Sequence, residues 1–197
     1  MEKNEFLAKA CDLFLEHGAK TLTMDDVSKA FGISKKTLYT KYRNKEELIE
    51  AVLHYKLDEV IAKLQLQNQQ IDCAVERMFC RDEDIDELAN SNNSLLIKQL
   101  IRYYPAIFSQ HMIEFSHKFA EVLIHNIEKG RQQGVYREDF DAEVYAKLFF
   151  QLVMSLESSP FMDSAEIDLV HYKKETMHFY MNAITTEEGK KLLKKYK

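Results

Sequence analysis

Helix start and stop signals follow one another closely in the first 45 residues of the chain. Apolar residues recur at helical spacing between Phe6 and Phe14, and Gly18 follows as a stop signal. Thr23 then opens a T-x-x-D capping pattern, and Ser34 stands where it can cap a further short helix. The N-terminal segment is therefore predicted to hold three helices, of which the second and third are short.

Glycine and proline are scarce, with five and two residues in a chain of 197. Strands and sheets need such residues at their turns, so this scarcity favours helices joined by short polar loops. A content of 46% hydrophobic and 30% charged residues suits a globular protein and excludes disordered, collagen-like and disulfide-scaffold classes. The predicted fold class is all-α, with about nine to ten helices.

A longer fourth helix is predicted to begin where Asn44 and Glu47 repeat the capping pattern, and to end near the polar stretch QLQNQQ. It is expected to leave an N-terminal domain of residues 1–56 and to enter a second domain of residues 57–197. Further helical patterns run over residues 72–89, 94–103, 105–133, 141–158 and 165–184.

The charge of the chain is unevenly distributed. The net charge is −5 and the isoelectric point is near 5.8, which argues against a protein coated with nucleic acid over its whole surface. The stretch from Lys29 to Lys45 nevertheless holds six basic residues and no acidic one. This stretch is a candidate anion-binding surface, although charge spacing alone fits a solvated lysine-rich face equally well.

Two short helices separated by a glycine-containing turn form a helix-turn-helix pattern over residues 24–43. Leu38 and Tyr42 are four positions apart and share the inner side of the second helix, so its other residues point outward. Lysines and small polar groups in outward positions suit base edges and phosphates in a DNA major groove. The outward residues are Lys35, Lys36, Tyr39 and Thr40, with Thr37 and Lys41 on the flanks.

The segment FLEHGAKTLTMDDVSKAFGISKKTLYTKYRNKEELIEAVL resembles the TetR family of bacterial transcriptional repressors. The family pattern runs through T-x-x-D-hydrophobic and G-hydrophobic-S-x-x-T-L-Y to an aromatic residue and N-K-E-x-L. The matching positions are Thr23, Asp26, Val27, Gly32, Ile33, Ser34, Thr37, Leu38, Tyr39, Tyr42, Asn44, Lys45, Glu46 and Leu48. Two positions depart from the pattern: Tyr42 replaces the commoner phenylalanine, and Asp25 stands where many members carry a basic or neutral residue.

By this resemblance, the third helix reads the major groove of a double-stranded DNA operator. The residues expected to share its base and phosphate contacts are Lys35, Lys36, Thr37, Tyr39, Thr40 and Lys41. Lys45 is expected to bind backbone phosphate, because the N-terminus of the fourth helix beside it carries unpaired N–H groups and partial positive charge. The resemblance also implies a homodimer on a palindromic operator, most often a repressor, that is released by a small-molecule effector of unknown identity.

Beyond residue 56 the resemblance weakens to architecture, in which a larger helical domain dimerises and binds the ligand. Apolar stripes within 141–158 and 165–184 are predicted to form a four-helix dimer interface, although either stripe suits an ordinary core equally well. The interface candidates are Leu148, Leu152, Met177 and Met181. An apolar ligand pocket is predicted from aromatic and methionine residues, most of which also suit plain helix packing. The pocket candidates are Tyr104, Phe108, Met112, Phe115, Phe150 and Met154.

Other classes of function have little support in the sequence. Motifs of α/β-hydrolases, zinc proteases, P-loop proteins and dinucleotide-binding proteins do not occur, so neither an enzyme nor a cofactor is expected. Three cysteines without a C-x-x-C pair predict no disulfide framework, and histidine spacing predicts no metal site. Cysteine usage and the lack of a signal-peptide or membrane-span pattern point to the cytoplasm. A helical interaction module that no longer binds DNA is the remaining alternative, for which Asp25 is the one hint.

Overall fold

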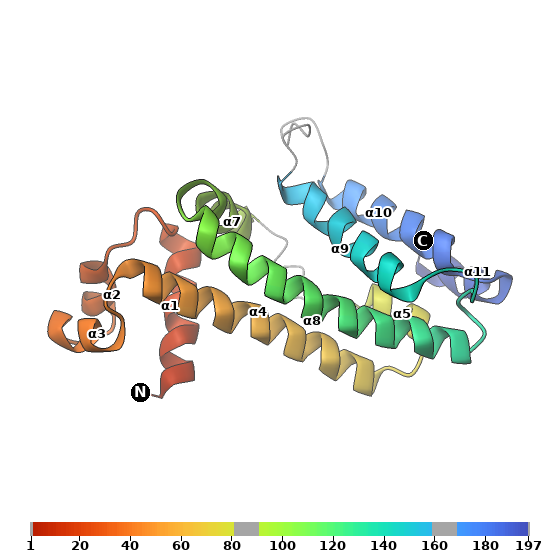
Figure 1. The fold of residues 1–197 in the computed structure, drawn as a ribbon, viewed down its shortest axis with the longest axis horizontal. Coiled ribbons are helices and arrows are strands. Elements are labelled where there is room, and N and C mark those ends of the chain that lie inside the picture. The colour runs from red at the N-terminus through yellow and green to blue at the C-terminus, as the bar shows by residue number, and fades with distance from the viewer. Residues whose placement is uncertain (1, 81–90, 159–168, 197) are drawn as a thin grey trace. The chain divides into compact units, whose positions relative to one another are not determined.

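The computed structural model of the chain describes residues 2–80, 91–158 and 169–196 and is built of helices (Figure 1). The elements are α1 (Lys3–His17), α2 (Met24–Ala30), α3 (Lys35–Lys41), α4 (Lys45–Gln70), α5 (Ala74–Phe79), α7 (Ser91–Tyr103), α8 (Pro105–Gln132), α9 (Ala142–Ser158), α10 (Leu169–Ile184), α11 (Glu187–Leu193) and a 3₁₀ turn (Lys194–Tyr196). Within the described ranges, β-structure is limited to one isolated bridge between Tyr136 and Thr185. The all-α fold class is therefore confirmed. In the same ranges, no helix has both the length and the apolarity that crossing a membrane requires.

The helices follow the predicted order, with differences at two places and one prediction that lies outside the described residues. The helix predicted over 72–89 begins as α5 but ends at Phe79, and residues 81–90 lie outside the described part of the chain. The start of the helix predicted over 165–184 also lies outside it. α11 has no counterpart among the predicted helices, although Thr186 caps it by accepting a hydrogen bond from the Gly189 N–H at 3.2 Å.

The chain divides into two compact units. Unit 1 comprises Met1–Ala62 and Arg81–Phe115, and unit 2 comprises Lys63–Cys80 and Ser116–Lys197. The helices α4 and α8 each contribute residues to both units, because each runs past a boundary between them. These units are defined by packing, so the functional division of the chain at residue 56 stays a prediction.

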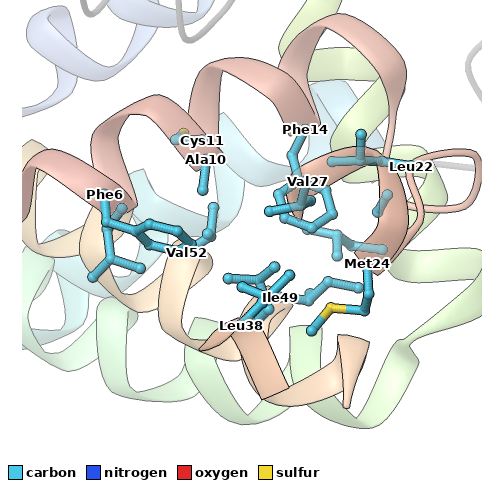
Figure 2. Close-up of a cluster of buried hydrophobic side chains, with 14 residues drawn as sticks. Phe6, Ala10, Cys11, Phe14, Leu22, Met24, Val27, Leu38, Ile49 and Val52 are labelled. Atoms are coloured by element: carbon cyan, nitrogen blue, oxygen red, sulfur yellow. The ribbon is translucent and has the colours of Figure 1, made fainter. Parts of the chain in front are cut away.

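The core of unit 1 is formed around one face of α1. Phe6, Ala10 and Phe14 recur every four residues on this face and are at most 2% exposed. Figure 2 shows them facing buried side chains of the following helices, among them Val27 of α2 and Leu38 of α3. Helices of seven residues are too short to be stable in isolation, so α2 and α3 depend on this shared core.

The core of unit 2 contains a buried tyrosine that ties two helices together. The Tyr136 side chain is 1% exposed, and its hydroxyl donates a hydrogen bond to the Ala74 carbonyl oxygen at 2.8 Å. Asn126 Nδ2 donates to the same oxygen at 3.1 Å. Gly130 makes room for the aromatic ring, because a Cβ at this position would lie 2.0 Å from a ring carbon of Tyr136. The start of α5 is thereby held to α8.

Candidate nucleic-acid interface

The caps that the sequence predicts hold the starts of α2 and α3. The Thr23 N–H donates to Asp26 Oδ2 at 3.0 Å and the Asp26 N–H donates to Thr23 Oγ1 at 3.2 Å, which completes a capping box. Hydrogen bonds from the Thr23 hydroxyl and backbone hold the pKa of the Asp26 carboxyl below its usual value. At α3, the Thr37 N–H donates to Ser34 Oγ at 3.0 Å. The sequence-predicted helix starts at these two positions are confirmed.

The turn between α2 and α3 requires a glycine. Gly32 has a φ of +60°, in the left-handed region that residues with a Cβ rarely adopt. The next residue, Ile33, donates its N–H to the Ser28 carbonyl oxygen at 3.0 Å and closes the turn. Before the turn, the Phe31 ring stacks on Phe6 with ring centroids 4.4 Å apart. These contacts fix the direction in which α3 leaves α2.

α3 is anchored on one side and open on the other. Leu38 is 0% exposed, and the half-buried Tyr42 that follows the helix has its ring 5.7 Å from that of Phe6. The residues predicted to point outward are all exposed, namely Lys35, Lys36, Thr37, Tyr39, Thr40 and Lys41. α3 therefore presents a lysine-rich polar face on a rigid support, as its spacing predicts.

The three lysines of α3 have different surroundings. Lys35 Nζ lies 2.5 Å from Asp25 Oδ2 on α2. Lys41 Nζ lies 5.6 Å from the centroid of the Phe6 ring, within cation–π range on the flank of the helix. Lys36 has neither an ion pair nor a hydrogen bond with any residue that the structure describes. On α3, Lys36 is the lysine whose ammonium is most available to a new anion.

The hydroxyl groups of α3 are partly used by the helix itself. The Thr37 and Ser34 hydroxyl oxygens lie 2.8 Å apart, and the Thr40 hydroxyl donates to the Thr37 carbonyl oxygen at 2.7 Å. Tyr39 is instead 46% exposed and offers both an aromatic ring and a phenol to the solvent. Lys36 and Tyr39 are therefore the outward groups least committed to contacts within the protein.

Lys45 makes a structural contact that its sequence position does not suggest. Its Nζ donates to the Lys20 carbonyl oxygen at 3.0 Å, and burial of the side chain lowers the pKa of the ammonium. Asn44 caps the same helix end, because its Oδ1 accepts the Glu47 N–H at 2.8 Å. Lys45 thus ties the start of α4 to the loop after α1. Two further N–H groups remain on its ammonium, so phosphate binding by Lys45 stays a prediction.

Lys20 joins three parts of unit 1 and was not singled out by the sequence patterns. Its N–H donates to Gln99 Oε1 at 2.7 Å, and its Nζ donates to the Tyr103 hydroxyl at 3.1 Å, while its carbonyl accepts from Lys45. Gly18 allows the Gln99 side chain to lie close to the backbone after α1, since a Cβ at position 18 would lie 2.6 Å from Gln99 Nε2. The partners on α7 are 79 and 83 positions away in sequence, so no local signal reveals them.

The residues predicted to line a ligand pocket are divided between the two units. Unit 1 holds four of them, all half-buried: Tyr104, Phe108, Met112 and Phe115. In unit 2, Phe150 is 8% exposed with its ring 5.4 Å from Phe119, and Met154 is half-buried. Their part in ligand binding stays a prediction. Across the described ranges, no group of three or more histidine, cysteine or acidic side chains is placed to hold a metal ion.

The predicted dimer residues do not share one exposed face. Leu148 is 49% exposed, while Leu152 and Met177 are half-buried. Met181 is 0% exposed in the core of unit 2, so its placement at an interface is corrected: it packs within its own chain. Phe179 is 69% exposed instead. Two positions along a helix turn the side chain through about 200°, which puts these neighbours on opposite sides of α10.

The chain is similar to known proteins in sequence and in fold. Residues 6–52 match the family described as bacterial regulatory proteins, tetR family. The fatty acid metabolism regulator protein of Bacillus subtilis (strain 168) is 19% identical over 182 residues, which cover 91% of this chain and 94% of that protein. The matched family segment begins within α1 and ends within α4. It therefore contains the whole of α2 and α3, which form the candidate nucleic-acid interface.

Two solved structures have a similar fold over nearly the whole chain. The transcriptional regulator FadR from Bacillus subtilis, in complex with stearoyl-CoA, has a TM-score of 0.69 at 16% identity and covers 91% of this chain and 98% of its own. SmeT, the repressor of the Stenotrophomonas maltophilia multidrug efflux pump SmeDEF, has a TM-score of 0.71 at 16% identity, with 95% and 92% covered. At these identities the similarity to the two solved structures shows the fold alone. The family is identified by the match of residues 6–52, which run from α1 into α4. The chain belongs to the TetR family of DNA-binding transcriptional regulators.

Proposed function

We propose that the protein is a repressor that binds a palindromic double-stranded DNA operator as a homodimer and leaves it when a small ligand binds. The observation that carries the DNA-binding part is the exposed face of α3, which Leu38 anchors and on which Lys36 and Tyr39 stand free. A helix held in this way can enter the major groove, where lysine donates to O6 and N7 of guanine. This role requires no catalytic group, and we place the protein in the cytoplasm.

Exposed apolar side chains on α9 and α10 support the homodimer. Val144 and Leu148 lie one turn apart on α9 and are each 49% exposed. Tyr172 and Phe179 lie two turns apart on α10 and are 37% and 69% exposed. Large apolar side chains left exposed on two neighbouring helices are typical of subunit interfaces. A two-fold dimer through these helices must place its two α3 helices about 34 Å apart, or a multiple of that, to read two half-sites.

A mainly apolar ligand is supported by half-buried aromatic and methionine residues within unit 1, such as Phe108 and Met112 of α8. The relative FadR holds stearoyl-CoA, which has a long apolar chain. Release requires that the ligand prefer a conformation whose α3 helices no longer match the half-site spacing, and DNA must then weaken ligand binding by the same factor. α4 is the proposed lever, because it starts at Lys45 and contributes residues to both units.

A ligand panel tests this part of the proposal. Apolar compounds that include long-chain acyl-CoAs are expected to raise Tm and to lower DNA affinity, since a ligand at about 100 times its Kd adds about 2.7 kcal/mol of stability. Met112→Ala is expected to reduce the response to the active compound more than it changes DNA binding without ligand. Thermal melts and fluorescence anisotropy measure both effects, and a panel that moves neither quantity contradicts the proposed ligand response.

The DNA-binding part is tested by replacing Lys36 with alanine. We expect operator binding to weaken by about 1 to 3 kcal/mol, the range of a lost base contact, with folding unchanged because the side chain is exposed. The operator probe is the strongest fragment that the wild-type protein selects from its own genomic DNA. Anisotropy titrations at several salt concentrations measure the effect, because phosphate contacts make affinity fall steeply with salt.

Lys98→Ala, which removes an exposed lysine of α7, is the matched control for Lys36→Ala. Equal operator affinity for the two variants would show that α3 does not read the DNA through this lysine. A wild-type protein with no salt-dependent affinity for any selected fragment would instead favour the interaction-module alternative.

A further inference from the structure

An ion pair connects the two helices of the candidate DNA-binding face. Asp25 is the second residue of α2, and Lys35 is the first residue of α3. Lys35 Nζ lies 2.5 Å from Asp25 Oδ2, and the two side chains are 59% and 46% exposed. The pair therefore lies at the protein surface and joins the recognition helix to the helix before it.

Asp25 lies in the first turn of α2, where the helix dipole favours any carboxylate, but its side chain does not cap the helix. The capping role belongs to its neighbour Asp26, whose carboxylate accepts from the Thr23 N–H and hydroxyl. The carbonyl oxygen of Asp25 accepts the Ser28 hydroxyl at 2.9 Å, a contact that needs no acidic side chain. Exposed ion pairs also contribute little to folding stability. Beyond this general effect on the helix, the carboxylate of Asp25 acts on Lys35 and on any anion that approaches this face.

The charge of Asp25 opposes binding of phosphate at the start of α3. A phosphate that approaches Lys35 must compete with a carboxylate already in contact with its ammonium, and the two anions repel each other. An ammonium has three N–H groups, so Lys35 can keep its contact with Asp25 and still donate to a neutral acceptor such as O6 or N7 of guanine. The ion pair thus disfavours phosphate contacts more than base contacts, and it also limits the directions in which Lys35 can point.

We propose that Asp25 is a specificity-determining residue, which holds Lys35 for a base contact and suppresses binding of this face to DNA of unrelated sequence. The inference rests on the proposed function and deepens it. It also gives the acidic departure from the family pattern a role within DNA binding, in contrast to the loss of DNA binding that the interaction-module alternative would require.

The test compares the full-length wild-type protein with Asp25→Asn on two duplexes. One duplex is the strongest genomic fragment selected by the wild-type protein, and the other is a scrambled duplex of the same length and composition. Asp25→Asn is expected to raise affinity for the scrambled duplex about threefold to tenfold and to steepen its log–log salt dependence by about one unit per subunit, as one lysine becomes free for phosphate. Affinity for the selected fragment is expected to change by less than about threefold, so the specificity ratio falls.

Asp12→Asn is the matched control, because it removes the same charge from an exposed position on α1. Lys35→Met and the double variant that combines it with Asp25→Asn complete a cycle that isolates the coupling between the two residues. Loss of Lys35 is expected to weaken binding to the scrambled duplex more when Asp25→Asn is already present than in the wild type. Circular dichroism checks that each variant folds. If Asp25→Asn does not fold, Lys35→Met breaks the same ion pair by removing its other partner.

Three results would overturn the inference: equal effects of Asp25→Asn and Asp12→Asn on the scrambled duplex, an unchanged specificity ratio, or a cycle without coupling. Failure of the proposed function looks different, because the wild-type protein itself would then show no salt-dependent binding to either duplex. The salt titration of the wild type therefore separates the two cases before any variant is made.

Discussion

The Phe179→Asp variant is expected to remain folded and to lose dimerisation. Phe179 is 69% exposed, so a charge at this position should change the free energy of unfolding of the chain by no more than about 0.5 kcal/mol. In a two-fold interface each aspartate would be buried against apolar side chains without a partner. The loss of dimerisation free energy is expected to be at least about 2 kcal/mol, or more than about tenfold in Kd. Light scattering at micromolar concentration measures the change.

Met181→Asp is the matched variant on the same helix and is expected to act on folding instead. Met181 is 0% exposed in the core of unit 2, where a carboxylate would have no water and no cation. We expect a cost of about 4 kcal/mol or more, a large part of the about 5 to 15 kcal/mol that stabilise a typical domain. Thermal denaturation followed by circular dichroism measures it. A folded monomer from Met181→Asp, or an intact dimer from Phe179→Asp, would contradict the assignment of the two faces of α10.

The second large effect is expected from Leu38→Ala, which removes the fully buried anchor of α3. Leu38 is 0% exposed, and truncation of such a leucine costs about 2 to 5 kcal/mol. A helix of seven residues cannot hold its shape without this contact, so the outward lysines would lose their common orientation. We expect operator binding to be lost while some salt-dependent affinity for any DNA remains. Anisotropy with selected and scrambled duplexes measures both, and thermal melts report the stability change.

Leu66→Ala is the control for this substitution, because it makes the same chemical change at a leucine that is 49% exposed. It should leave both Tm and DNA affinity close to the wild-type values. If Leu38→Ala bound the selected fragment as tightly as Leu66→Ala does, the packing of α3 would not be what positions the recognition face.

The start of the chain shows how far local signals reach. Each of the local signals acts within a few residues: the capping box at Thr23, the cap at Ser34 and the turn at Gly32. The amino-acid sequence alone therefore predicts where α2 and α3 begin and end. Helical spacing likewise predicts that Leu38 is buried while the lysines around it are exposed. The resemblance to the TetR family rests on the same residues, which is why it is specific there and weak beyond residue 56.

The second half of the chain shows where periodicity is insufficient. A heptad-like stripe that includes Met177 and Met181 fits a core and an interface equally well, and the structure assigns Met181 to the core. Phe179 lies outside that stripe and is the residue left exposed. The spacing of apolar residues in the sequence predicts which side chains share a face of a helix. Whether that face is buried depends on the neighbouring helices.

The amino-acid sequence by itself determined the all-α class, the helix-turn-helix and the outward face of α3, because caps, glycine turns and helical spacing act between residues close together in the chain. Only the tertiary structure decided which of those outward groups are free. The Asp25–Lys35 pair, the hydrogen bond from Lys45 to Lys20 and the contact of Lys20 with Gln99 join residues 10, 25 and 79 positions apart. Such contacts depend on how the helices pack, which no local pattern of residues encodes.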